Sequence, residues 1–187
     1  ASFHANRREA LRAELPEHAM AVFFSISLQT RSGDVDYAFH QDPNFYYLSG
    51  FTEPNSLLII LKDTQQNDTI SYNELLFIQA PNVSKEIWTG RTLTIEEAQK
   101  VSGIKDVILH TELEKYDMPF SKCEAVFVYN KKSLENTYSE EDNKYELQQM
   151  FQKKLTEAGK SAANEKRLST ILTKLREVKQ EEELRMM

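Results

Sequence analysis

The sequence predicts an α/β fold: a mixed β-sheet flanked by helices on both faces, with a helical C-terminal extension. Two observations predict this class. Short apolar runs alternate with amphipathic helical patterns along most of the chain, an order typical of a buried sheet covered by helices. From Ser133 onward the character changes, and two helical stripes in charged surroundings follow.

The first half is predicted to hold one helix and four strands. Asn6–Leu15 carries apolar residues at helical spacing, and Pro16 stops the helix. Thr30–Gln41 is predicted to be a loop, because Gly33 and two aspartates supply turn chemistry. The last two strands surround a polar turn at Asp63–Asp68 and predict a hairpin. The strands are Met20–Ile26, Phe45–Leu48, Ser56–Lys62 and Ile70–Gln79.

The second half begins with a loop at Ala80–Arg91, which contains the only tryptophan, Trp88. Thr94 is a natural N-cap for a helix over Ile95–Val101; Glu97 completes a capping box and Gly103 closes the helix. The remaining pattern predicts strands at Asp106–Leu109 and Ala125–Tyr129 around a helix at Thr111–Tyr116, then helices at Tyr145–Glu157 and Leu168–Val178, and a helix that begins in Gln180–Met187.

Composition limits the kinds of partner. The 187 residues are 40% hydrophobic, enough for the core of one domain with at most an appendage. The net charge of -6 argues against nucleic acid and anionic membrane surfaces. The apolar runs are far too short to span a membrane. The single cysteine, Cys123, excludes an internal disulfide and indicates a reducing compartment, so a cytoplasmic location is expected.

The sequence shows no catalytic motif. The four histidines are widely spaced, and no zinc-binding or phosphate-loop motif is present. The best spacing for a metal is that of Asp34, Asp36, His40 and Asp42, but such loop carboxylates are more often solvated or paired with a cation such as Arg31. Cys123 is expected to be a small residue at a strand edge, since no activating base lies nearby in sequence.

Two aromatic features permit two interpretations each. Trp88 either packs on the rim of its own core or, flanked by Gly90 and Arg91, serves as an interface or substrate-facing anchor. For Tyr46 and Tyr47, strand alternation would place one ring inside and the other outside.

Four blocks of the sequence form a specific combination. They are R-R-E-A-L at Arg7–Leu11, T-R-S-G-D-V-D-Y-A-F at Thr30–Phe39, F-Y-Y-L-S-G-F-T-E-P at Phe45–Pro54 and E-I-W-T-G-R at Glu86–Arg91. Together they resemble the N-terminal domain of aminopeptidase P (Xaa-Pro aminopeptidase), in the creatinase/prolidase family. The chain departs from the usual pattern at His40, where arginine is common, and at Asp42–Asn44, where a serine-containing turn is common.

The resemblance implies a division of the chain and of the work. Residues 1–174 would be the N-terminal domain, and residues 175–187 the linker and first helix of an absent catalytic domain. That catalytic domain would hold two divalent metal ions, usually manganese, which activate water against the Xaa-Pro bond. This chain would then hold no metal, contain no catalytic residue and be inactive alone.

The resemblance also implies partners. They are the chain's own catalytic domain, neighbouring subunits of a homo-oligomer, and proline-containing peptides for the parent enzyme. Trp88 would reach toward a neighbour's active-site entrance. The candidates for a structural loop network are Arg31, Asp34, Asp36, Tyr37 and His40. An exposed apolar patch is expected where the catalytic domain docks.

Two other hypotheses stay open. A stand-alone binding or assembly module would keep the fold without any peptidase activity, although the unfinished helix at Gln180–Met187 argues against it. An independent enzyme would use the Asp34, Asp36, His40 and Asp42 loop, and would require bound metal together with turnover.

Overall fold

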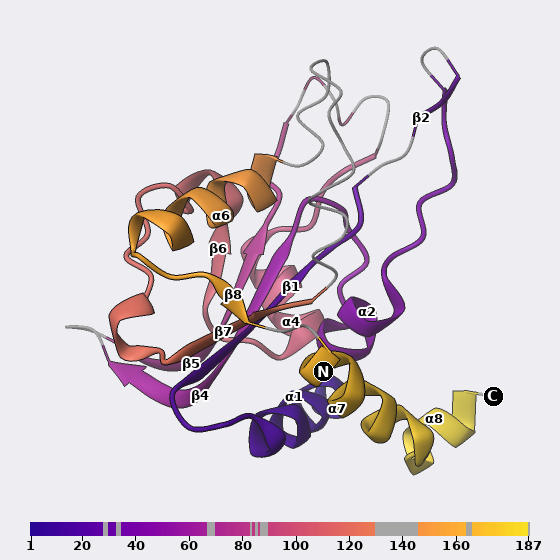
Figure 1. The fold of residues 1–187 in the computed structure, drawn as a ribbon. Coiled ribbons are helices and arrows are strands. Elements are labelled where there is room, and N and C mark those ends of the chain that lie inside the picture. Colours follow the sequence, from indigo (N-terminus) through magenta and orange to yellow (C-terminus); the bar gives the residue numbers. More distant parts are fainter. Residues whose placement is uncertain are drawn as a thin grey trace.

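A six-stranded mixed sheet forms the centre of the computed structural model (Figure 1). The structure describes residues 1–27, 30–32, 35–66, 70–82, 84, 86, 90–129, 146–163 and 166–186. The strands of the sheet are β1 (Ala19–Phe24), β4 (Leu57–Gln66), β5 (Ser71–Ile78), β6 (Val107–Leu109), β7 (Ala125–Val128) and β8 (Ala162–Ala163). Their order is β6-β5-β4-β1-β7-β8. The β1–β4 and β4–β5 pairs are antiparallel, and the other three pairs are parallel.

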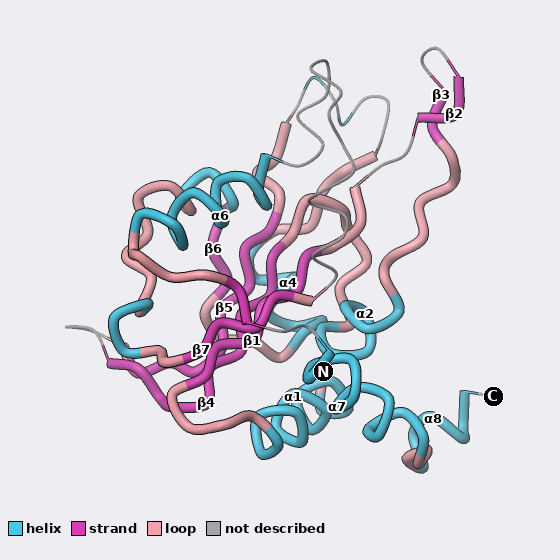
Figure 2. Tube along the Cα trace, viewed as in Figure 1, coloured by secondary structure: helices cyan, strands magenta, loops and turns pink. Residues whose placement is uncertain are grey.

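Helices cover both faces of this sheet, as the sequence predicts (Figure 2). One face carries α1 (Ser2–Glu14), α2 (Pro43–Ser49), α4 (Ile95–Ser102) and α7 (Lys166–Glu177). The other carries α6 (Glu146–Glu157) and two 3₁₀ turns, η1 (His110–Glu112) and η2 (Phe120–Lys122). The predicted helical extension is also present, as α8 (Glu181–Met186) follows α7.

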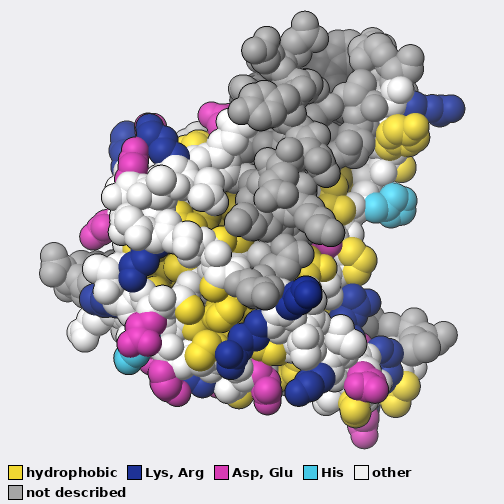
Figure 3. Space-filling view, in the orientation of Figure 1, with side chains coloured by type: hydrophobic (Ala, Val, Ile, Leu, Met, Phe, Trp, Pro, Cys, Tyr) yellow, Lys and Arg dark blue, Asp and Glu magenta, His cyan; other side chains and the backbone are white. Residues whose placement is uncertain are grey.

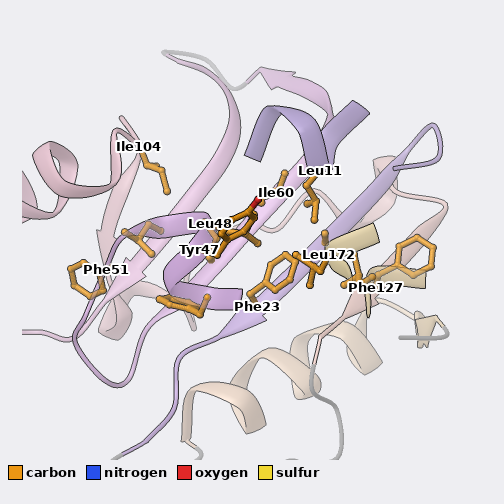
Figure 4. Packing of buried hydrophobic residues seen from close by; sticks show 14 of the residues in the cluster. Leu11, Phe23, Tyr47, Leu48, Phe51, Ile60, Ile104, Phe127 and Leu172 are labelled. Carbon is orange, nitrogen blue, oxygen red and sulfur yellow. The ribbon is translucent and has the colours of Figure 1, made fainter. Parts of the chain in front are cut away.

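The core consists of two layers, because successive side chains of a strand point to opposite faces. Along β1, Ala21 and Phe23 face α1, α2 and α7, while Met20 and Val22 face α6. Figure 4 shows Leu11, Leu48 and Leu172 from these three helices gathered near Phe23. A sheet buried on both faces explains why its central strands are apolar runs rather than alternating ones.

Two buried arginines of α1 tie that helix to the rest of the domain. The Arg8 Nη1 group donates to the carbonyl oxygens of Leu48 at 2.8 Å and Ser102 at 3.0 Å, in the last turns of α2 and α4. A cation at two helix C-termini is favoured by both helix dipoles. The Glu74 carboxylate of β5 accepts from Arg8 Nε and, at 2.9 Å, from Arg12 Nη2.

The predicted strand at Phe45–Leu48 is wrong, since this segment lies in α2. Asp42 is the N-cap, and its side chain accepts hydrogen bonds from the amides of Asn44 and Phe45. Pro43 occupies the start of the helix, where its missing N–H costs nothing. Gly50 ends the helix in the left-handed conformation, at φ 67°.

Smaller differences concern the turns. The predicted turn after Lys62 begins later, because β4 continues to Gln66 and pairs Gln65 with Tyr72. The predicted loop Thr30–Gln41 contains a separate two-stranded sheet of β2 (Thr30–Ser32) and β3 (Val35–Asp36). The Thr111–Tyr116 helix is reduced to η1 and a turn, β8 was not predicted, and Ser84 and Glu86 are helical within the predicted loop Ala80–Arg91.

Where the chain is described, no helix has both the length and the apolar character that a membrane crossing requires.

Candidate functional site: the loop end of the sheet

Several connecting segments begin or end at one end of the sheet, which we call the loop end. Here β1, β5, β6 and β7 finish and β4 begins. The described parts of segments 25–42, 50–56 and 79–94 therefore begin or finish at this end of the sheet. The sequence blocks Thr30–Phe39, Phe45–Pro54 and Glu86–Arg91 all fall within or beside these segments.

Gln41 joins two of these segments. Its Oε1 atom accepts from the amides of Ile26 at 3.1 Å and Asp42 at 3.0 Å. Its Nε2 group donates to the carbonyl oxygen of Glu53 at 2.9 Å. The side chain thus connects the end of β1, the start of α2 and the turn before β4.

Glu53 extends this connection to the segment after β5. Its Oε1 atom accepts a 2.7 Å hydrogen bond from the Leu93 amide. Its Oε2 atom is buried and has no hydrogen-bond partner among the described residues. Burial raises the pKa of the Glu53 carboxyl, and the negative charges of Glu97 and Glu86 raise it further, against the opposing effects of the Leu93 amide and Arg91. A partly buried carboxylate with one unpaired oxygen is costly to keep, and perturbed pKa values of this kind cluster at functional sites.

The segment around Arg91 has its own polar contacts. Arg91 donates to both carboxylate oxygens of Glu97, at 3.0 Å and 2.6 Å, and this pairing lowers the pKa of Glu97 to about 2. Thr92 Oγ1 donates to Glu86 at 2.9 Å. Residues 90–93 are therefore held on both sides, by α4 and by Glu53.

Three of the predicted loop candidates have described side chains, in the same chain segment as Gln41. Arg31 lies on β2, and Arg31, Tyr37 and His40 are exposed, with Tyr37 at 58%. Asp36 lies on β3 opposite Thr30, and its side chain lies outside the described residues. Asp34 and Trp88 also lie outside the described residues.

The Asp42 carboxylate serves as the N-cap of a helix. The residue is 8% exposed, and the helix that it caps is α2. Within the described ranges, no group of three or more His, Cys, Asp or Glu side chains could hold a metal ion.

Gln41 and Glu53 are the residues that sequence reasoning missed. Glu53 belongs to the sequence block that ends at Pro54, but its hydrogen-bond partner Leu93 is forty residues further along the chain. No local pattern announces a contact of that range.

The other candidates behave as expected. Tyr46 is 45% exposed and Tyr47 is 6% exposed, so one ring points out and one in, although on a helix. Cys123 is 3% exposed, and burial raises the pKa of its thiol to about 11, which leaves it a poor nucleophile at neutral pH.

Solved structures share this fold. A Bacillus anthracis structure assigned as an aminopeptidase P is 28% identical, with a TM-score of 0.73, over 98% of this chain and 42% of that one. Proline aminopeptidase P II from Yersinia pestis is 23% identical, with a TM-score of 0.70, over 98% of this chain and 40% of that one.

Curated relatives point the same way. The Xaa-Pro aminopeptidase of Escherichia coli K12 is 29% identical over 109 residues, which is 58% of this chain and 24% of that enzyme. Xaa-Pro aminopeptidase 3 of Dictyostelium discoideum is 36% identical over 99 residues, 53% of this chain and 18% of the relative. The chain thus matches only a fraction of the length of these relatives.

The family model for the N-terminal domain of aminopeptidase P matches residues 4–129, which include β1, α2, the turn at Glu53 and the Arg91 segment. This chain belongs to the aminopeptidase P N-terminal domain family.

Proposed function

We propose that this chain is the non-catalytic N-terminal domain of a metal-dependent Xaa-Pro aminopeptidase, a parent enzyme that removes the N-terminal residue ahead of proline. Relatives with this activity in their names support the proposal, and each matches the chain over a small part of its own length. The fold supports it as well, since a TM-score of 0.73 extends over nearly the whole chain.

The domain's work would be to shape the active-site entrance and to hold subunits together in a homo-oligomer. The observation that carries this proposal is the loop end, where Glu53 and Gln41 tie three chain segments to one another. Such cross-linking gives loops a defined shape, which an entrance or a subunit contact requires. Trp88 lies between Glu86 and Arg91 in one of these segments, and we propose that it reaches toward a neighbouring subunit's entrance.

The proposed catalytic chemistry belongs to a separate domain. Two divalent metal ions, most often manganese, would polarise the substrate carbonyl and lower the pKa of the attacking water. Their ligands would lie in that domain, as would the contacts to the scissile peptide bond. We place the parent enzyme in the cytoplasm, and we propose neither nucleic acid nor a membrane as a partner.

A hydrolysis assay tests the proposal. This chain and the full product of its open reading frame are each incubated with an Xaa-Pro tripeptide and manganese. We expect turnover only from the longer product. Turnover by this chain alone would overturn the assignment, and an inactive longer product would favour a stand-alone assembly module of the same fold.

The role of Trp88 is tested in the longer product. Trp88→Ala is expected to raise KM for peptides longer than a tripeptide, or to weaken subunit association in sedimentation, since a tryptophan anchor commonly contributes about 2 kcal/mol or more. Trp88→Phe should retain part of the effect. Tyr46→Ala, which removes an exposed aromatic ring on α2, is the control. If Trp88→Ala leaves both KM and association unchanged, the proposed role for Trp88 is wrong.

A further inference from the structure

The last turn of α7 is bound to the sheet domain by two side chains of α2, one of which also bonds a tyrosine just after β7. Arg176 Nη1 donates to the Asn44 Oδ1 atom at 2.9 Å. Asn44 Nδ2 in turn donates to the Tyr129 hydroxyl at 2.6 Å. The Tyr47 hydroxyl donates to the carbonyl oxygen of Leu175 at 3.0 Å. We call these five residues the junction clamp.

The clamp holds the guanidinium of Arg176 in one orientation. Its central carbon lies 5.7 Å from the centroid of the Tyr47 ring, within range of a cation–π contact. The Asn44 bond fixes the guanidinium plane from a second direction. Arginine loses little entropy per bond when its rigid fork is preoriented in this way.

The clamp joins the part of the chain that the family model matches to the part that follows it. Asn44, Tyr47 and Tyr129 lie within residues 4–129, whereas Leu175 and Arg176 do not. The connection to α8 comprises only residues 178–180. In Figure 1, α8 continues from α7 away from the sheet. The direction of α8 therefore depends on how the last turn of α7 is held.

Contacts around the connection support this dependence. The Gln180 amide donates to Glu183 Oε2 at 3.0 Å, which closes the first turn of α8. Lys179 Nζ donates to the Arg176 carbonyl oxygen. Glu183 also lies near enough to the clamp that its charge, after burial, helps to raise the pKa of Tyr47.

We propose that Asn44 and Arg176 are positioning residues, which fix the direction in which α8 leaves the sheet domain. In the parent enzyme, this direction sets where the sheet domain stands relative to the catalytic domain. This second part rests on the function proposed above, whereas the clamp itself does not.

The clamp lies at the surface, which makes it suitable for mutation. Asn44, Tyr129 and Arg176 border an open hollow of about 500 Å³. Figure 3 shows Lys and Arg side chains over α7 with hydrophobic atoms between them. Removing the Arg176 side chain there opens no cavity in the core, so the variants are expected to fold.

The first test measures the direction of α8 in this chain. Spin labels are attached at Lys153→Cys on α6 and Glu182→Cys on α8, and the distance distribution is measured by pulsed electron paramagnetic resonance. Both positions are exposed, while the native Cys123 is buried. We expect a narrow distance distribution in the labelled chain without further substitution. With Arg176→Ala or Asn44→Ala added, the distribution should be at least twofold broader. Arg176→Lys should restore part of the narrowness.

Arg167→Ala is the matched control. Arg167 lies on the same helix and also covers an aromatic ring, with its guanidinium carbon 6.0 Å from the Phe127 centroid. It takes no part in the clamp, so its distribution should stay narrow. Two results would overturn the proposal that the clamp fixes α8: a broad distribution in the labelled chain without further substitution, or equal broadening by Arg167→Ala.

The second test uses the active longer product. Arg176→Ala is expected to raise KM for an Xaa-Pro peptide about tenfold and to change kcat less than about twofold, because a displaced entrance weakens binding without altering the reacting groups. An unchanged KM beside a broadened distance distribution would overturn the positioning role alone. An inactive parent product would overturn the proposed function and leave the distance measurement to decide the clamp.

Discussion

The network beneath α1 and the network at the loop end each contain a glutamate carboxylate, but the two carboxylates differ in how they are paired. Beneath α1, both oxygens of Glu74 accept from guanidinium groups, one from Arg8 and one from Arg12. At the loop end, one oxygen of Glu53 accepts from a backbone amide, and the second oxygen is buried with no partner in the part of the chain that the structure describes. The first carboxylate is satisfied by two cations, and the second is not.

From this difference we infer that the network beneath α1 serves stability, and we propose the loop end as the region that serves a partner. A buried charge that is fully paired holds its surroundings in one arrangement, and removing one member is strongly destabilising. A partly buried carboxylate with one unpaired oxygen lowers the stability of the fold, and proteins retain such a group mainly where function requires it. The loop end also carries exposed Tyr37 and His40, whereas Arg8 is fully buried.

The largest effect is expected from Arg8→Ala. It should lower the free energy of unfolding by about 3 kcal/mol, because the carbonyls of Leu48 and Ser102 and one oxygen of Glu74 lose their donor at once. Urea denaturation measures the change.

Arg185→Ala is the control for charge removal. Its side chain is 77% exposed in an i,i+4 pair with Glu181, so a cost below about 0.5 kcal/mol is expected. A cost of less than about 1 kcal/mol for Arg8→Ala would show that the α1 network contributes no more to stability than a surface ion pair.

An intermediate effect is expected from Asp42→Ala. This variant tests whether residues 43–49 form a capped helix rather than a strand. Loss of the cap leaves the amides of Asn44 and Phe45 without their acceptor and should cost about 1–2 kcal/mol. Asp42→Asn should cost less, since asparagine also caps helices. Equal costs for the two variants in denaturation experiments would show that the charge matters rather than the cap.

The smallest effect, and one of opposite sign, is expected from Glu53→Gln. Burial raises the pKa of Glu53 above its ordinary value of 4.5, so the folded state favours the protonated carboxyl. The stability that this preference contributes is fully present below pH 4.5. That contribution is lost as the pH rises through the folded-state pKa. The glutamine variant carries no charge to desolvate, so it should match the parent near pH 4 and exceed it at pH 7 in urea denaturation.

Glu97→Gln supplies the matched control at the same end of the sheet. The pKa of Glu97 is lowered to about 2 by Arg91, so its contribution is present above pH 4.5 and disappears as the pH falls toward 2. The two variants should therefore differ from the parent in opposite directions at neutral pH. If Glu53→Gln is less stable than the unsubstituted chain at pH 7, the Glu53 carboxylate has better hydrogen-bond partners than the structure indicates.

Locally encoded features could be predicted from the sequence. Thr94, Glu97 and Gly103 predict the start and end of α4 correctly, since a capping box and a terminal glycine act over one or two turns. The segment at Phe45–Leu48 failed because aromatic residues favour strands in general, while the cap at Asp42 and the proline after it decide for a helix here.

Long-range pairings could not be predicted. Arg8 and Glu74 are separated by 66 positions, and Glu53 and Leu93 by 40, so neither pair leaves a periodic trace. The strand order depends on similar contacts. The role of Trp88 stays a prediction, because it concerns a partner rather than a feature of this chain.

The position of β1 has a consequence for the order in which the domain assembles. Its antiparallel partner β4 is complete at Gln66, but its parallel partner β7 begins only at Ala125. During synthesis, one edge of β1 is therefore paired early, while the other stays open until β7 emerges from the ribosome. An apolar strand with an open edge is prone to pair with another chain. Slow translation between these two strands would thus lengthen the period in which the nascent chain is most vulnerable to aggregation.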